Sequence, residues 1–349
     1  MSIRVMVVDD SAFMRKIISD ILNSDNEIDV IGTARNGKDA LEKLEKMSPD
    51  VITLDIEMPI MDGISTLTEI IKKYNIPVIM LSSLTTEGAD ATLKALDIGA
   101  VDFIPKPNNI FGLNKELQNN KIVEKVKMAA GIKKFKKTQQ TISNNKNKWI
   151  NVSNLKYCDS QYLIAIGTST GGPKALQSLI PQIPNEFNGS IVLVQHMPQG
   201  FTKSLATRLN SISNINVKEA EDGEKILKGY CYIAPGDNHM TVIEKNNQLC
   251  IKLNKDMPVS GHRPSVDVLM ESISVLSCKK LIGIMLTGMG SDGSKGLKKI
   301  YDNGGYTIAQ DEETCVVYGM PKSAINIGAV SKVLPLSQIV DEIMSKMEV

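Results

Sequence analysis

Short runs of apolar residues alternate along this chain with segments whose apolar positions repeat at helical spacing. In the first third the runs cover residues 3–8, 30–31, 50–54, 77–81 and 101–104. After the first run, Phe13/Met14, Ile17/Ile18 and Ile21/Leu22 recur at the spacing of one helix face. Repeated strand–helix units are typical of a parallel sheet with helices on both faces. We therefore expect a doubly wound α/β domain here.

The same rhythm returns in the second half, with apolar runs over residues 163–166, 191–194, 230–234, 281–286 and 306–309. Between the halves, residues 121–148 hold nine lysines against a single acid, Glu124. Residues 122–128 fit the end of a helix, and the remainder is too polar to bury. We predict one domain over residues 3–120, a helix end and linker over 121–154, and a second doubly wound parallel-sheet domain over 155–347.

The bulk composition excludes several classes of protein. A net charge of +1, with 42% hydrophobic and 23% charged residues, gives no electrostatic footprint for nucleic acid. No apolar stretch approaches a membrane span, and the N-terminal residues lack the layout of a signal peptide. The five cysteines are scattered and without metal-ligand spacing, which indicates reduced thiols. We expect a cytoplasmic protein without membrane insertion, whose lysine-rich segment is a solvated tether rather than a nucleic-acid site.

Polar residues follow the predicted strands of the first domain directly. They are Asp9, Asp10, Asp55, Ser82 and Lys106. Ligands of such sheets bind outside the carboxyl ends of the strands. Three carboxylates at one edge need a cation, and Mg²⁺ suits hard oxygen ligands and phosphate oxygens. A lysine and a hydroxyl beside them favour an aspartate that accepts a phosphoryl group. The simpler alternative, that these acids only cap helices, explains one of them but not four strand ends together.

These residues resemble the receiver domain of two-component response regulators, a flavodoxin-like fold, from Ile3 to about Asn120. The matching motifs are Val7-Val8-Asp9-Asp10-Ser11, Leu54-Asp55-Ile56-Glu57-Met58-Pro59, Met80-Leu81-Ser82-Ser83 and Lys106-Pro107. The resemblance implies that Asp55 is phosphorylated in the presence of Mg²⁺. The implied metal ligands are Asp9, Asp10, Asp55 and the backbone carbonyl of Glu57. The residues implied to sense the phosphoryl group are Ser82, where threonine is also usual, Lys106 and the switch aromatic Phe103.

Three strand ends of the second domain carry the residue types of acyl transfer. Ser169 lies in Gly167-Thr168-Ser169-Thr170-Gly171-Gly172, which matches the strand-to-helix turn of a nucleophilic serine. His196 and Asp292 follow the runs that end at Gln195 and Leu286. Histidine can take the serine proton, and a carboxylate fixes its tautomer. The order Ser…His…Asp differs from that of ordinary α/β-hydrolases, but geometry rather than order defines a triad. A plain turn or anion-binding nest is the alternative for Ser169.

Other residues compete for the same roles. His239 and His262 are the remaining histidines, and Asp237 and Asp267 are further carboxylates that caps or turns would also explain. Glycine-rich turns at residues 171–172 and 288–290 offer N–H groups for an oxyanion, or serve only as tight turns.

The second domain looks like the catalytic domain of chemotaxis protein-glutamate methylesterases of the CheB type, with a Rossmann-like α/β fold, from about Gln161 to near the C-terminus. Besides the serine turn, the motifs include Gln195-His196-Met197-Pro198, His262-Arg263-Pro264-Ser265, Thr287-Gly288-Met289-Gly290-Ser291-Asp292-Gly293 and Tyr318-Gly319-Met320-Pro321. The resemblance implies Ser169 as nucleophile, His196 as base, Asp292 as its orienter and the Met289 N–H in the oxyanion hole. Thr168 stands where the motif commonly has alanine.

The combined resemblance implies a hydrolase that removes glutamate γ-methyl esters from chemoreceptors, releasing methanol, and often deamidates receptor glutamines. A histidine kinase would be the phosphodonor, and the ester chemistry needs no cofactor. The receiver would cover Ser169 until Asp55 is phosphorylated.

Two other classes of protein lack the sequence features that they would need. A DNA-binding response regulator would need a basic recognition helix, which the strand-rich second half does not show. A nucleotide-binding oxidoreductase would need Gly-x-Gly-x-x-Gly spacing, which residues 167–172 lack.

Overall fold

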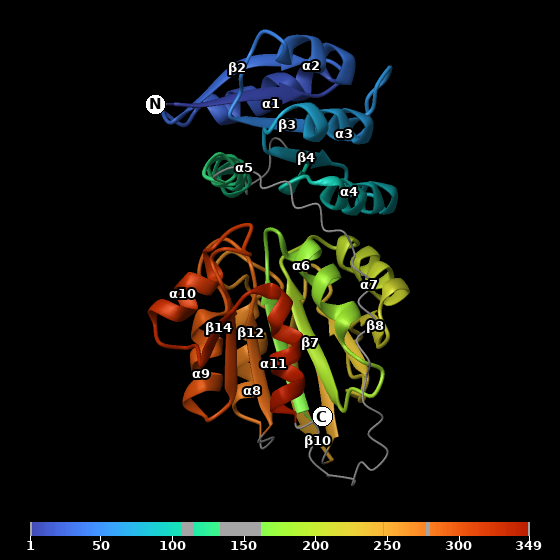
Figure 1. Cartoon of the computed structure of the whole chain (residues 1–349), viewed down its shortest axis with the longest axis vertical. Helices are drawn as coiled ribbons and strands as arrows, with labels where there is room; N and C mark the ends of the chain where they lie inside the picture. The colour runs from blue at the N-terminus through green and yellow to red at the C-terminus, as the bar shows by residue number, and fades with distance from the viewer. Residues whose placement is uncertain (1, 107–114, 133–161, 247, 277–279, 348–349) are drawn as a thin grey trace.

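The protein is described by a computed structural model, which covers residues 2–106, 115–132, 162–246, 248–276 and 280–347. Two domains follow one another along the long axis of the molecule (Figure 1). The predicted linker beyond residue 132 lies outside the described residues, as do two of the five cysteines. Cys231, Cys250 and Cys315 are free thiols.

The first domain is a parallel sheet of strand order β2-β1-β3-β4-β5. Its strands are β1 (Ile3–Val8), β2 (Ile28–Ala34), β3 (Val51–Asp55), β4 (Val78–Ser82) and β5 (Asp102–Pro105). Its helices are α1 (Ala12–Asn23), α2 (Gly37–Leu44), α3 (Gly63–Lys73), α4 (Thr86–Ile98) and α5 (Lys115–Ala130). Every residue of β3 and β4 is buried, because helices cover both faces of the sheet. The predicted boundary at residue 120 falls inside α5, which packs against α1 and β4.

The second domain is a parallel sheet of order β14-β13-β12-β6-β7-β9-β8. Its strands are β6 (Tyr162–Thr168), β7 (Gly189–Gln195), β8 (Asn216–Glu219), β9 (Tyr230–Ile233), β12 (Leu281–Met285), β13 (Tyr306–Gln310) and β14 (Lys332–Leu334). Its helices are α6 (Gly172–Leu179), α7 (Phe201–Ile212), α8 (Val266–Ser274), α9 (Ser294–Asp302), α10 (Met320–Asn326) and α11 (Ile339–Lys346). The doubly wound prediction is confirmed for both domains. It missed β8, β14 and an antiparallel hairpin, β10 (His239–Lys245) with β11 (Gln248–Asn254).

The strand order of the second sheet determines where the site of this domain lies. The chain starts this sheet at β6, adds β7 on one side, and returns later to add β12 on the other. Because the order reverses at β6, the carboxyl ends of β7, β6 and β12 border one crevice. Ser169, His196 and Asp292 lie in the segments that follow these three ends.

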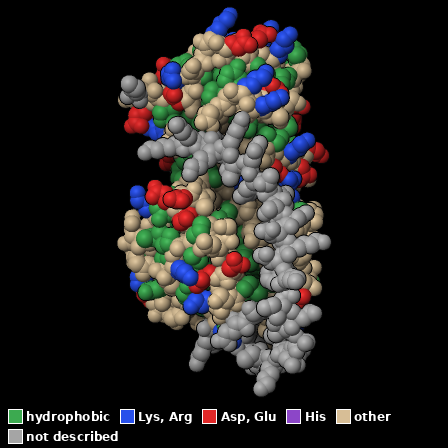
Figure 2. Space-filling view, viewed as in Figure 1, with side chains coloured by type: hydrophobic (Ala, Val, Ile, Leu, Met, Phe, Trp, Pro, Cys, Tyr) green, Lys and Arg blue, Asp and Glu red, His purple; other side chains and the backbone are tan. Residues whose placement is uncertain are grey.

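The two domains are in direct contact. Helix α4 of the first domain packs against α6 and α7 of the second. The Phe103 ring stacks on the Phe201 ring with 4.8 Å between centroids, and Asp97 pairs with Arg208. Acidic and basic side chains are interspersed over both lobes of the face in Figure 2, in keeping with the near-zero net charge. No helix within the described ranges has both the length and the apolar character to cross a bilayer.

Candidate functional site

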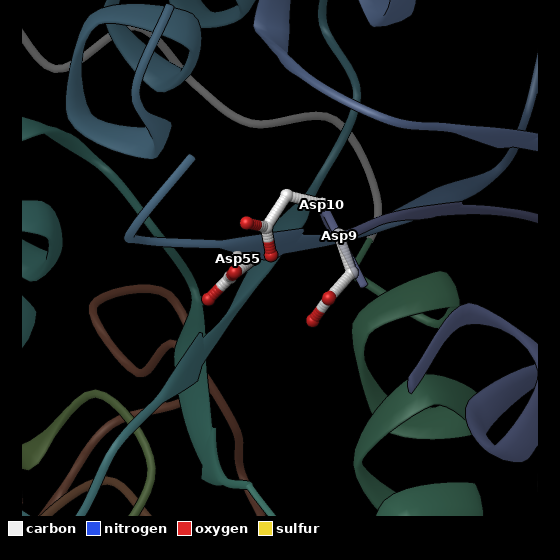
Figure 3. A group of neighbouring side chains, drawn as sticks. All are labelled: Asp9, Asp10 and Asp55. Carbon is white, nitrogen blue, oxygen red and sulfur yellow. The ribbon is translucent and has the colours of Figure 1, made fainter. Parts of the chain in front are cut away.

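The first candidate site is a group of carboxylates at the carboxyl edge of the first sheet. Asp9 and Asp10 follow β1, and Asp55 ends β3; one oxygen of each lies within 4.8 Å of the others (Figure 3). Asp9 and Asp55 are buried, whereas Asp10 is exposed. The cap of α1 is Ser11, whose hydroxyl accepts from Met14 N at 3.3 Å. Helix capping therefore does not account for these three acids.

Lys106 is the cation that joins this group. Its Nζ lies 2.7 Å from Asp55 Oδ2 and 3.1 Å from Asp9 Oδ2. Burial raises the pKa of Asp55 to about 6, and the Asp9 charge adds to this while Lys106 opposes it. Burial also works against the charge of Lys106, but the two carboxylates together raise its pKa. One lysine does not neutralise three carboxylates, so the donor set fits a divalent cation with hard oxygen ligands.

The other predicted receiver residues have distinct surroundings. The Ser82 hydroxyl accepts from Thr92 Oγ1 at 2.7 Å and donates to the Gly88 carbonyl at 3.1 Å, so it is engaged with α4 rather than with Asp55. The backbone N–H of Glu57 bonds to the Asp55 carboxylate; a metal-binding role for its carbonyl stays a prediction. Phe103 is buried against the second domain.

The second candidate site lies at the crevice of the second sheet. Thr168 at the end of β6 pairs with Gln195 at the end of β7, so Ser169 and His196 follow matched positions on neighbouring strands. His196 Nε2 lies 2.8 Å from Asp292 Oδ2. His196 and Asp292 side chains are only 6% and 1% exposed, so water competes little for this bond. A Cβ on Gly288 would lie 2.9 Å from the Ser169 Cβ, which places the 288–290 turn against the serine.

Asp292 is held by the beginning of α8. Its carboxylate accepts from Ser265 Oγ at 2.7 Å, Val266 N at 2.8 Å and Asp267 N at 3.2 Å, besides the bond to His196. Burial alone would raise the pKa of Asp292, but the bond to His196 and those at the helix start lower it to about 2. The carboxylate is therefore ionised at neutral pH. Because it engages Nε2, the other ring nitrogen of His196, Nδ1, is left free of Asp292, and it is buried without a partner among the described residues.

The serine turn depends on close backbone approach. Gly171 has φ +79°, in the left-handed region that glycine adopts at little cost. A Cβ on Gly172 would lie 1.9 Å from Gln195 Oε1. The Gln195 amide donates to the Ser169 carbonyl at 2.9 Å and to the His196 carbonyl at 3.2 Å. Gln195 therefore ties the two strand ends together.

Comparison with known proteins follows the same division of the chain. The family model for CheB methylesterase matches residues 164–343, and the model for the response regulator receiver domain matches residues 5–118. The chain belongs to the CheB methylesterase family.

The relatives match this CheB-family chain over nearly its whole length. Protein-glutamate methylesterase/protein-glutamine glutaminase of Pyrococcus horikoshii is 45% identical over 99% of this chain and 94% of its own. The Bacillus subtilis protein of the same name is 47% identical over 98% of both chains. The crystal structure of the Thermotoga maritima CheB methylesterase catalytic domain is 47% identical, with a TM-score of 0.52, and covers 53% of this chain and 98% of that one.

The competing residues of the CheB-family domain have structural partners. His239 Nδ1 accepts from Ser265 N at 3.2 Å and its Nε2 bonds the Met257 carbonyl at 3.1 Å, so both nitrogens are occupied. Asp237 pairs with Arg263, and Asp267 accepts from Gly296 N at 2.8 Å. His262, the third histidine, stacks on His196.

Sequence reasoning did not assign site roles to Gln195 or Ser265. Gln195 was visible only as the last residue of an apolar run, and Ser265 only as part of a motif ahead of a helix. The sequence signal that could have identified Gln195 is that a polar residue ends a buried apolar strand.

Proposed function

We propose that this chain hydrolyses glutamate γ-methyl esters on the cytoplasmic helices of chemoreceptors and deamidates receptor glutamines, with Ser169, His196 and Asp292 as one catalytic unit. The observation that carries the proposal is the buried bond between His196 and Asp292 beside the serine turn. The names of the relatives supply the substrate class.

The proposed chemistry uses two acyl-transfer steps. Ser169 Oγ attacks the ester carbonyl while His196 Nδ1 takes its proton, and Asp292 stabilises the imidazolium through Nε2. The Met289 N–H supports the developing oxyanion from the turn that lies against Ser169. His196 then gives the proton to the departing methanol, or to ammonia when a glutamine is the substrate. Water attacks the acyl-enzyme in the same manner and releases the glutamate side chain and free Ser169.

The receiver would control this site. A histidine kinase would transfer its phosphoryl group to Asp55, with Asp9, Asp10, Asp55 and the Glu57 carbonyl holding Mg²⁺. When bound, Mg²⁺ supplies positive charge against the phosphoryl oxygens. Lys106 would exchange its contact with the Asp55 carboxylate for one with the phosphoryl group. Ser82 would leave Gly88 to bond to the same group, which changes the start of α4.

Contacts between the domains support an inhibitory role for the unphosphorylated receiver. Asp102 accepts from Thr170 Oγ1 at 2.5 Å, one residue from the proposed nucleophile. Phe103, next to Asp102, stacks on Phe201 at the beginning of α7. A change at β5 and α4 would loosen these contacts and expose the crevice to a receptor helix, an activation by population shift.

The test is methanol release from methylated receptor membranes by the full chain, with and without beryllofluoride and Mg²⁺. Ser169→Ala, His196→Ala and Asp292→Asn should each abolish most activity, and the double variants should lose little more. Ser178→Ala, at a serine whose hydroxyl bonds to the Lys174 carbonyl within α6, is the matched control. Full activity in Ser169→Ala would refute the catalytic assignment, and an unchanged rate with beryllofluoride would refute the regulatory one.

A further inference from the structure

Two histidine rings lie face to face at the candidate active site. The centroids of His196 and His262 are 3.8 Å apart and their planes differ by 4°. The bond from His196 Nε2 to Asp292 fixes one edge of the His196 ring but leaves the ring free to tilt about that bond. A flat ring in van der Waals contact removes this freedom. His262 therefore supplies the second constraint that the base needs.

His262 is itself held firmly by a tight turn. Val259 and His262 exchange backbone hydrogen bonds of 2.9 and 3.1 Å. The two residues between them, Ser260 and Gly261, have φ of +52° and +77°, as a two-residue hairpin turn requires. The next residue, Arg263, anchors the segment through Asp237 and the Lys255 carbonyl.

The same segment also holds the acid of the site. Three residues after His262, Ser265 and the N–H groups of Val266 and Asp267 bind the Asp292 carboxylate. Residues 259–267 therefore set the position of Asp292 and the plane of the His196 ring together. This arrangement is more than is needed to build a loop, because both constraints converge on His196.

Burial and neighbouring positive charges favour a neutral His262. Burial lowers the pKa of His262 to about 3, His196, Lys121 and Lys125 act in the same direction, and Asp292 opposes them. The lysines belong to α5 of the first domain, and Lys121 Nζ donates to the Gly261 carbonyl at 3.2 Å. A neutral ring adds no charge repulsion to the imidazolium that His196 forms during acyl transfer. A charged neighbour would oppose it.

We infer that His262 is a positioning residue for the catalytic base, keeping the ring of His196 in the plane in which Nε2 meets Asp292 and Nδ1 is left for Ser169. This rests on the proposed function of Ser169, His196 and Asp292. His262 touches no reacting atom in this scheme; it acts through His196.

The first test compares His262→Ala, which removes the ring, with His262→Phe, which keeps a flat ring that cannot titrate. Val275→Ala, an exposed site just past α8, is the control. Ester hydrolysis is measured with the full chain activated by acetyl phosphate and Mg²⁺. We expect His262→Ala to lower kcat roughly 10- to 100-fold with little change in KM. His262→Phe should restore kcat to within about fivefold of the wild type.

The pH profile separates positioning from folding. In His262→Ala, water replaces the ring over His196 and solvates the imidazolium, so the acid limb of kcat/KM should move to higher pH. In His262→Phe the limb should stay in place. If His262 only stabilised its loop, the substitution would reduce the fraction of active enzyme without moving the acid limb of kcat/KM. Wild-type kcat in His262→Ala, or equal losses in both variants, would overturn the inference.

A second readout does not depend on activity. The chain has three histidines, so histidine-selective ¹⁵N labelling gives a spectrum simple enough to assign. We expect a single His196 tautomer, protonated at Nε2, in the wild type and in His262→Phe, and exchange between tautomers in His262→Ala. Protonation of wild-type His196 at Nδ1 would overturn the inference. If the wild type proves to have no esterase activity, the proposed function fails, while this spectrum still decides whether His262 orients His196.

Discussion

Thr168 precedes the proposed nucleophile, and the structure gives its hydroxyl a definite place. Thr168 Oγ1 donates to the Thr287 carbonyl at 2.9 Å, and Ser169 N donates to the same carbonyl at 3.1 Å. The end of β6 is thus joined twice to the segment after β12. The hydroxyl, which stands where the motif commonly has alanine, therefore braces the turn before Ser169.

We expect Thr168→Ala to keep esterase kcat within about threefold of the wild-type value. The Ser169 N–H still donates to the Thr287 carbonyl in this variant, so the turn keeps one of its two bonds. The free energy of unfolding should fall by about 1 kcal/mol for the lost hydrogen bond. Urea unfolding and ester hydrolysis measure the two effects. Gly172→Ala is the contrasting variant, because its Cβ would overlap Gln195 Oε1 and should remove most activity. A loss above about tenfold in kcat for Thr168→Ala would give the hydroxyl a part in the chemistry instead.

At the scale of elements, the beginning of α8 and the carboxylate of Asp292 form one unit. Ser265 accepts from Val268 N as the helix cap and donates to Asp292. Burial would raise the pKa of this carboxyl, but the bond to His196 and the donors at the start of α8 lower it to about 2, against an ordinary 3.8. Ionised Asp292 therefore stabilises the folded chain at every pH at which this carboxyl group is also ionised in the unfolded chain.

The sign of the resulting pH dependence follows from the lowered pKa. The stabilisation by Asp292 is fully present above about pH 4 and is lost as the pH falls through about 2. Asp292→Asn should therefore destabilise the chain more at pH 7 than at pH 3. Urea unfolding of both proteins at pH 7, 4 and 3 measures the difference, with Asp302→Asn on the surface of α9 as a control. A difference that grows toward low pH would contradict the assigned ionisation.

Sequence periodicity predicted the elements that are marked by an apolar pattern within one continuous stretch of the chain. The runs in β1, β3, β4 and β7 are continuous and apolar because helices bury both faces of these strands. The short edge strands β8 and β14 and the β10–β11 hairpin lacked such runs. In the site, Ser169, His196 and Asp292 were predictable because each follows a strand end. The stack of His262 on His196 was not, because a turn after the hairpin brings together rings that are far apart in the chain.

At the scale of the whole molecule, the two domains are held by a small set of contacts beside the crevice. Asp102 bonds to Thr170 and also pairs with Lys125 at 2.8 Å. Phe103 stacks on Phe201, and a small cavity lined by residues of α4 and α6 remains between the domains. These contacts involve β5 and α4, which adjoin Ser82 and Lys106. Phosphorylation at Asp55 would therefore act on the interface through neighbouring residues.

The ion pair between Asp97 of α4 and Arg208 of α7 allows the strength of this interface to be tested by charge exchange. Both side chains are partly exposed, so the pair should contribute about 0.2–1 kcal/mol to docking of the receiver. Arg208→Asp places two acids together and should raise basal esterase activity about two- to fivefold. Asp97→Arg should do the same with two cations.

The double variant Asp97→Arg/Arg208→Asp restores an opposite-charge pair and should return the basal rate toward that of the wild type. Activity with beryllofluoride should be the same in all four proteins, because the interface is then already loosened. Exchange of Lys16 and Asp20, a pair within α1, is the control for charge reversal as such. Single variants with an unchanged basal rate, or a double variant as active as the singles, would show that this contact does not hold the receiver over the active site.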